Sequence, residues 1–186
     1  MKKIISILLL TCTLFFSLGI CLATPHEPTV EKDAAIQWII DQTKDRLPEH
    51  TARQIVDHAY WQSERLKLDP MLVLAMMKVE SGFNTRAKSS EGAQGLLQVL
   101  PRYHKDKLRG RSAYEPTVGI EVGAIVLNDC MERSRGSMLK AMNCYSGGGG
   151  MKYLNKVLNV QRDARRTVLF SIFDKRQMVV AESNVN

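Results

Sequence analysis

The segment Asp69-Pro-Met-Leu-Val-Leu-Ala-Met-Met-Lys-Val-Glu80-Ser-Gly82 decides how this chain folds. Aspartate followed by proline is a typical helix start, because the aspartate caps free backbone N–H groups and proline suits the first helical position. Every residue from 71 to 79 is apolar except Lys78, and a helix that is apolar on nearly all sides is usually buried. Glycine at position 82 indicates the helix end. We therefore predict a buried central helix that carries Glu80 in its last turn.

Further helices are predicted on both sides of this central helix. Apolar residues at helical spacing indicate helices over about 33–47, from about 51 onward, over 93–100, from Pro116 onward, over 138–145 and over 151–158. The chain between them is predicted to form a polar linker over 24–32 and loops over 81–92 and 102–115. Residues 161–186 are expected to form a solvated tail, in which 168–173 favours neither strand nor helix. With no repeat and no series of strands, the sequence predicts an all-α protein.

The first residues are typical of a secretory signal peptide. Lys2 and Lys3 precede an apolar run that extends to Ile20, and small residues follow, with a cleavage site after Ala23. A retained membrane anchor is an alternative, because the run is at the short limit for a spanning helix. Lipidation of Cys21 is another, although the residue before a lipid-carrying cysteine is normally smaller than isoleucine. We expect an exported, periplasmic protein.

Length and charge limit the classes of function. The chain has 186 residues, which suits a single domain, and a formal net charge of +7. A basic exported protein suits an anionic partner such as cell wall, membrane surface or nucleic acid. The lysines and arginines are scattered, which disfavours nucleic acid. A basic cluster near the C-terminus could dock a partner, although a solvated tail is the simpler interpretation: Arg162, Arg165, Arg166, Lys175 and Arg176.

Two cysteines remain once the predicted signal peptide is set aside. Cys130 and Cys144 lie at comparable distances on either side of a turn predicted at 134–137. In an oxidising compartment such a pair can form a disulfide. The alternative is two buried free thiols, because cysteine packs well as a small apolar residue.

Glu80 is a candidate general acid on physical grounds alone. A carboxyl group at the edge of a buried helix loses hydration, which raises its pKa. A carboxylic acid that stays protonated near neutral pH can protonate a glycosidic oxygen. A solvated glutamate at a helix end is the alternative, and position alone leaves both open.

The residues around Glu80 resemble a known family. The stretches Glu80-Ser-Gly-Phe-Asn84, Ala87-Lys-Ser89 and Gly92-Ala-Gln-Gly-Leu-Leu-Gln98-Val-Leu-Pro101 resemble the lytic transglycosylase family of the soluble type. Leu97 replaces the family's methionine, an exchange that conserves volume. Tyr145-Ser-Gly-Gly-Gly-Gly150 and Tyr153-Leu-Asn-Lys-Val157 match later family motifs more loosely, since Ser146 stands for asparagine and Cys144 for alanine. The resemblance covers about residues 55–160.

This resemblance implies a lysozyme-like fold and an activity on peptidoglycan. The catalytic domain would span 51–160, between an N-terminal linker and helix over 24–50 and the tail over 161–186. Glu80 would cleave the bond between N-acetylmuramic acid and N-acetylglucosamine and form a 1,6-anhydro ring. Ser89, Gln98 and Tyr145 would contact the sugar. The alternatives are that Ser89 satisfies backbone groups and that Gln98 and Tyr145 are ordinary surface residues.

Two other functions stay open. A hydrolysing muramidase on the same fold would need a second carboxylate to activate water, and the candidates are Glu91, Asp106, Glu115 and Glu121. A wall-binding protein without turnover is the other. An enzyme of this kind could serve a secretion, conjugation or pilus machine, or a phage. The four histidines show no ligand spacing, so we expect neither a metal nor a cofactor.

Overall fold

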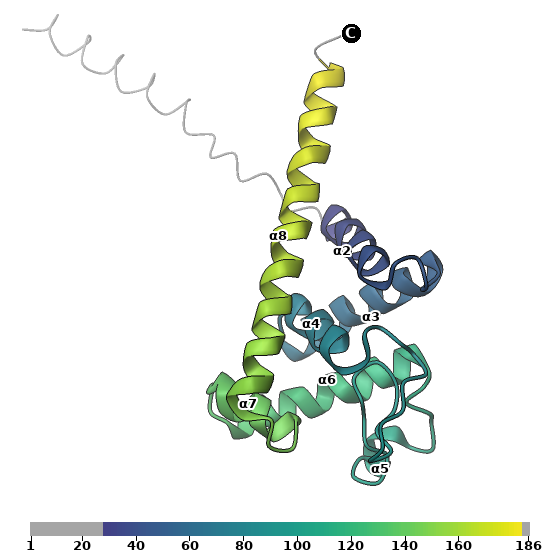
Figure 1. Cartoon of the computed structure of the whole chain (residues 1–186), viewed down its shortest axis with the longest axis vertical. Coiled ribbons are helices and arrows are strands. Elements are labelled where there is room, and N and C mark those ends of the chain that lie inside the picture. Colours follow the sequence, from purple (N-terminus) through teal and green to yellow (C-terminus); the bar gives the residue numbers. More distant parts are fainter. Residues whose placement is uncertain (1–27, 184–186) are drawn as a thin grey trace, which may run out of the picture.

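A computed structural model describes residues 28–183, and its regular structure is helical (Figure 1). The helices are α2 (Pro28–Thr43), α3 (Glu49–Leu66), α4 (Pro70–Ser81), α5 (Lys105–Leu108), α6 (Pro116–Arg133), α7 (Met138–Tyr145) and α8 (Gly150–Ser183). Only two isolated β-bridges interrupt this pattern in the described part of the chain. The all-α prediction is confirmed. The predicted signal peptide over 1–23 lies outside the described residues.

Helix α4 is the centre of the core, as its sequence predicts. All residues from 71 to 77 are buried. The carboxylate of Asp69 accepts a hydrogen bond from the backbone N–H of Met71 at 3.0 Å, which caps the first turn. At the other end Gly82 adopts a left-handed conformation (φ 58°), and its N–H donates to the carbonyl of Lys78. The helix therefore starts and stops where the local chemistry requires.

Helix α8 runs along the whole body and packs against α2, α4 and α7 (Figure 1). Residues 161–183, expected to form a solvated tail, continue this helix, and most of their described side chains are exposed. Ala164 and Val168 are buried and lie four residues apart, on the side of the helix that faces the core. Gln161 and Arg165 both donate hydrogen bonds to the carboxylate of Asp69. These bonds tie the middle of α8 to the start of α4.

The N-terminal helices complete the main core. Helix α2 begins at Pro28, inside the predicted linker, and ends at Thr43, before the predicted limit. Its Trp38 is buried and makes an edge-to-face contact with Phe83 at 5.6 Å between ring centroids. This contact links α2 to the loop that follows Glu80. Within the described residues, no helix combines the length and apolarity needed to span a bilayer.

The short helix predicted over 93–100 is wrong. Gln94 and Val99 exchange backbone hydrogen bonds as an antiparallel bridge, at 2.8 and 3.0 Å. Gly95 and Gln98 both have positive φ angles, +71° and +46°, which a helix does not contain. A Cβ atom on Gly95 would lie 2.1 Å from the carbonyl oxygen of Ala113. The apolar residues at helical spacing here face the core from turns.

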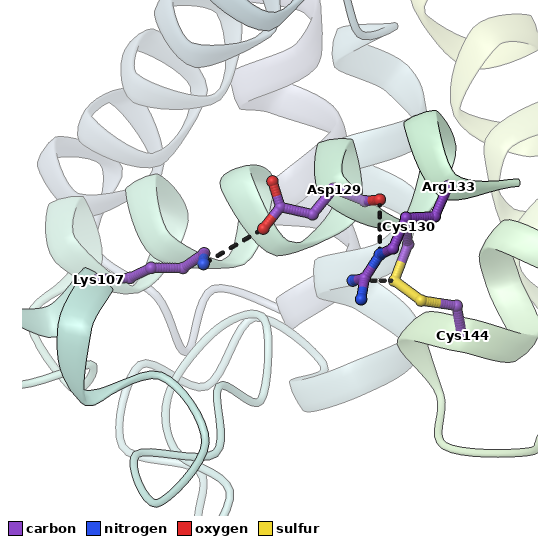
Figure 2. The surroundings of a disulfide bond; sticks show 5 residues. All are labelled: Lys107, Asp129, Cys130, Arg133 and Cys144. Carbon is purple, nitrogen blue, oxygen red and sulfur yellow. Dashed lines mark hydrogen bonds and ion pairs between the residues drawn. A yellow bond between two sulfur atoms is a disulfide. The ribbon is translucent and has the colours of Figure 1, made fainter. Parts of the chain in front are cut away.

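A disulfide joins the last turns of α6 and α7. Cys130 is buried, Cys144 is exposed, and their sulfur atoms are 2.07 Å apart across a sequence separation of 14 residues (Figure 2). Ser137 caps α7 between them by accepting a hydrogen bond from the N–H of Lys140. The guanidinium group of Arg133 contacts the bridge at 3.8 Å and donates to the carbonyl oxygen of Asp129. The bridge thereby fixes α7 against α6.

Replacing both Cys130 and Cys144 with alanine should lower the free energy of unfolding by about 2–3 kcal/mol, because a bridge across a loop of this length restricts the unfolded chain. Urea denaturation would measure the loss. A reducing agent should bring the wild-type protein to the stability of the double variant and leave the variant unchanged. Equal stability of wild type and variant under oxidising conditions would contradict the prediction.

Candidate active site

Glu80 lies in the last turn of α4, where the buried helix meets the surface. Its carboxyl group is partly buried. Burial raises the pKa of this carboxyl above its ordinary value, and a hydrogen bond from Tyr153 offsets part of that rise. The hydroxyl of Tyr153 donates to Oε1 of Glu80 at 2.5 Å. The other carboxyl oxygen, Oε2, makes no hydrogen bond within residues 28–183.

Two tyrosines surround this carboxyl group. Tyr153 belongs to the first turn of α8, and Tyr145 ends α7. Burial raises the pKa of both phenols far above their ordinary value, and the negative charge of Glu80 raises each further. Both therefore stay neutral hydrogen-bond donors at any physiological pH. The hydroxyl of Tyr145 donates to the carbonyl oxygen of Leu97 at 2.7 Å, which holds α7 against the loop after α4.

The loop after α4 is fastened by contacts from both sides. The hydroxyl of Ser81, the residue after Glu80, lies 2.9 Å from the carbonyl oxygen of Leu96. On the other side Leu97 packs directly against α6, where a Cβ atom on Gly123 would lie 2.5 Å from the Cβ of Leu97. A second small core fixes the far part of the loop: Val99, Leu108, Ala113, Val118 and Val122. The loop is therefore rigidly placed beside Glu80.

Ser89 and Gln98 lie in this loop, and part of their hydrogen-bonding capacity serves the loop itself. The hydroxyl oxygen of Ser89 accepts from the N–H of Ala93 at 3.0 Å. The side-chain amide N–H groups of Gln98 donate to the carbonyl oxygens of Ala87 and Gly95, at 3.3 and 3.0 Å. The hydroxyl hydrogen of Ser89 and the amide oxygen of Gln98 are left as the groups that a ligand could use.

All of the sequence-predicted site residues line one cleft of about 660 Å³. Glu80, Ser89, Gln98 and Tyr145 come together there from α4, the loop and α7, and α8 adds Tyr153. The disulfide forms part of the wall, because both Cys130 and Cys144 also line the cleft. A partly buried acid, neutral phenols and polar loop groups suit the binding of a polar, uncharged chain such as a sugar polymer, with a proton available at one point.

The glycine run beside Tyr145 forms a tight turn at the cleft rim. The hydroxyl of Ser146 accepts from the N–H of Gly149 at 2.8 Å. A Cβ atom on Gly149 would lie 2.6 Å from that hydroxyl oxygen and 2.8 Å from the Cβ of Tyr153. Glycine at 149 thus allows Tyr153 to approach the rim closely enough to reach Glu80.

The other candidate carboxylates are occupied elsewhere or lie apart. Glu91 lines the same cleft, but its side chain is 73% exposed and pairs with Arg102 at 3.3 Å. Glu121 forms a two-pronged ion pair with Arg111. Asp106 and Glu115 are absent from the cleft lining. No three His, Cys, Asp or Glu side chains in the described part of the chain are grouped to hold a metal ion.

Tyr153 is a residue of the candidate site to which the sequence alone assigns no role. It stands in the segment Tyr153-Leu-Asn-Lys-Val157, which resembles a motif of the family and is the feature of the sequence that points to this residue. Its partner is 73 residues away in the sequence, and a tyrosine in an amphipathic helix usually belongs to the core. Only the packing of α8 against α4 reveals the contact.

Comparison with known proteins links the chain to enzymes of murein. A family model described as "Transglycosylase SLT domain" matches residues 59–167. The chain is 38% identical over 86 residues to the transglycosylase of Enterobacteria phage PRD1. The matched region covers 46% of this chain and 32% of the phage protein. The chain is 33% identical over 86 residues to membrane-bound lytic murein transglycosylase C of Actinobacillus pleuropneumoniae, covering 41% of this chain and 24% of that protein.

Among solved structures, the chain is similar to an inactive mutant of the lytic transglycosylase Slt from Pseudomonas aeruginosa. The identity is 19% and the TM-score 0.47, over 67% of this chain and 24% of the other. The matched region spans only about a quarter to a third of the length of these curated relatives.

Replacing Tyr153 with phenylalanine should raise the pKa of Glu80 further, because the lost hydrogen bond favours the charged carboxylate. Carbon-13 NMR of labelled glutamate side chains during a pH titration measures this directly. Tyr145→Phe is the matched control, since its hydroxyl donates to a backbone carbonyl oxygen and not to Glu80. It should move the Glu80 titration less. A Glu80 pKa that falls or stays unchanged in Tyr153→Phe would contradict the role given to this hydrogen bond.

Proposed function

The chain belongs to the family of transglycosylase SLT domains, and from this membership we propose that it cleaves the glycan strands of peptidoglycan as a lytic transglycosylase. Glu80 is the proposed catalytic acid and base. The observation that carries this assignment is the position of Glu80: a carboxyl group with a raised pKa, held by a neutral phenol, in the cleft where the family motifs converge.

The proposed reaction has two steps, both served by the same carboxyl group. Glu80 first donates its proton to the glycosidic oxygen between N-acetylmuramic acid and N-acetylglucosamine, and the bond to the anomeric carbon of N-acetylmuramic acid breaks. The resulting carboxylate then takes the proton of the C6 hydroxyl of the same N-acetylmuramic acid. That oxygen closes a 1,6-anhydro ring on the anomeric carbon, so no water is consumed. Glu80 regains its proton and is ready for another turnover.

The environment of Glu80 suits both steps. Burial keeps the carboxyl group protonated at higher pH than an exposed glutamate, which the first step requires. The hydrogen bond from Tyr153 to Oε1 stabilises the carboxylate that forms in the middle of the reaction. Because Oε2 has no partner in the described residues, it is the oxygen that we assign to proton transfer. Tyr153 therefore acts as a positioning residue for the acid.

Ser89, Gln98 and Tyr145 are proposed to bind the sugar. Ser89 and Gln98 each keep one hydrogen-bonding group that the loop does not use, a hydroxyl hydrogen and an amide oxygen. Sugar hydroxyl and acetamido groups offer the matching donors and acceptors. Tyr145 would supply one edge of the cleft with its ring, because its hydroxyl is bonded to Leu97.

A hydrolysing muramidase is the second candidate. The observation in its favour is that Glu91 lines the same cleft as Glu80. An inverting hydrolase needs a carboxylate that activates water opposite the acid. Glu91 lines the same cleft as Glu80, but its ion pair with Arg102 and its exposure suit a solvated rim residue. A transglycosylase needs no such group, and we therefore prefer it.

Export to the periplasm is proposed from the predicted signal peptide over 1–23, and it agrees with a substrate that lies outside the cytoplasm. The bridge between Cys130 and Cys144 supports an oxidising compartment. A service role for a secretion, conjugation or pilus machine, or in a phage, stays a prediction. One of the relatives is a phage transglycosylase.

Glu80→Gln should reduce glycan cleavage by about a thousandfold, as expected for loss of a general acid. At pH values above neutral, the variant should also have a higher melting temperature than the wild-type protein. A carboxyl with a raised pKa in the folded state stabilises the fold fully only at acidic pH, and this contribution is lost as pH rises through that pKa. Turbidity of purified sacculi and calorimetry at several pH values measure the two effects. Wild-type activity in this variant would remove Glu80 from the mechanism.

Mass spectrometry of sacculi digested with the purified protein identifies the reaction. Products ending in 1,6-anhydro-muramic acid, one water lighter than the reducing sugar, are expected. Glu91→Gln is the matched control and should keep both the rate and the product. Reducing ends that disappear with Glu91→Gln would assign the protein as a muramidase. A folded protein that releases no product would contradict both candidates.

A further inference from the structure

The second half of α8 exposes large apolar side chains that nothing in the described chain covers. Leu169, Phe170 and Phe173 are 63%, 64% and 58% exposed. The C-terminal part of α8 extends past the other helices (Figure 1). A soluble surface tolerates single exposed apolar residues, but neighbouring ones usually mark a contact site. The proposed cleavage reaction makes no use of this part of the molecule.

These side chains lie on one side of the helix together with arginines. At 3.6 residues per turn, six exposed residues between positions 162 and 176 fall within about 120° of the helix circumference. They form the outer face of α8: Arg162, Arg166, Leu169, Phe170, Phe173 and Arg176. The outer face points away from Ala164 and Val168, which pack into the core. Within residues 28–183 these side chains are therefore left exposed.

The charge of the outer face has one sign. Its three arginines are interleaved with the apolar residues, and the nearby acidic residues, Asp163 and Asp174, lie outside its arc. Arginine can keep its guanidinium group at a polar boundary while its aliphatic stem lies along apolar surface. Helices that lie in the interface of a membrane insert phenylalanine and leucine and usually carry their basic residues on the opposite, polar face. In α8 the arginines lie among the apolar residues, and their long side chains would have to bend away from the bilayer to reach the lipid phosphates.

We propose that the outer face of α8 binds an anionic membrane surface. Leu169, Phe170 and Phe173 would enter the boundary between headgroups and acyl chains, and the arginines would pair with lipid phosphates. A second copy of the chain fits less well, because two outer faces would set arginines against arginines. A partner helix is also disfavoured, because the apolar arc is wider than the narrow seam of a coiled coil.

This binding would place the cleft at a set distance from the membrane contact. Tyr153 and Phe173 belong to the same unbroken helix, and at 1.5 Å per residue their positions are about 30 Å apart along its axis. The reacting carboxyl of Glu80 is bonded to Tyr153. Helix α8 would therefore hold the cleft at a fixed distance from the membrane to which its outer face binds.

Cosedimentation of the purified protein with phospholipid vesicles tests the proposal. Wild-type protein should bind vesicles that contain phosphatidylglycerol about tenfold or more tightly than vesicles of phosphatidylcholine alone, and salt should weaken the binding. Phe170→Ser with Phe173→Ser, and separately Arg166→Gln with Arg176→Gln, should each reduce binding by about tenfold or more. All proteins compared share the same N-terminus, so any contribution of residues 1–27 is common to them.

Matched controls come from the other side of the same helix. Met178 is 64% exposed and Lys175 is also exposed, but both lie outside the outer face. Met178→Ser with Lys175→Gln should leave binding unchanged, and circular dichroism should show the same helix content in every variant. Equal loss in this control, or absence of wild-type binding to the phosphatidylglycerol vesicles, would overturn the proposal. Self-association that disappears with Phe173→Ser, without vesicle binding, would assign the face to a second copy instead.

Discussion

The burial of helix α4 is the constraint on which the rest of the structure depends. A helix that is apolar on nearly every side must be surrounded, and α3 and α8 pack directly against it. The helix ends where the core ends, so the carboxyl group of Glu80 is desolvated without being sealed off. The same packing brings Tyr153 to that carboxyl group. The unusual chemistry of the site thus follows from a requirement of folding.

The cleft is assembled by polar contacts between elements that are distant in sequence. Tyr145 holds α7 to the loop at Leu97, and Ser81 holds the end of α4 to the same loop at Leu96. Both of these contacts use a backbone carbonyl oxygen of the loop, so they occupy none of its side chains. Side-chain groups of the loop remain for a ligand, and this division of roles explains how a segment without regular structure can form a defined wall.

The sequence predicted those parts of the fold whose signals are local. The cap at Asp69 and the stop at Gly82 both act within one helical turn, and each lies where it was expected. The helix predicted over 93–100 is wrong because apolar residues in tight turns can mimic helical spacing. In the structure Leu97 packs against Gly123 of α6 from such a turn. The extent of α8 and the role of Tyr153 depend on contacts with α4, α2 and α7 that no local pattern reports. The prediction that Ser89, Gln98 and Tyr145 belong to one site rests on the family motifs and not on their spacing, and all three line the same cleft.

The separation of 73 residues between Glu80 and Tyr153 has a consequence for the order of events in synthesis. A growing chain presents its N-terminal parts first, so α4 emerges well before α8 exists. Until α8 has emerged and docked, Glu80 lacks its hydrogen bond from Tyr153, and α4 lacks one of the helices that bury it. The contact between Glu80 and Tyr153 therefore forms only after the segment that carries α8 has been synthesised.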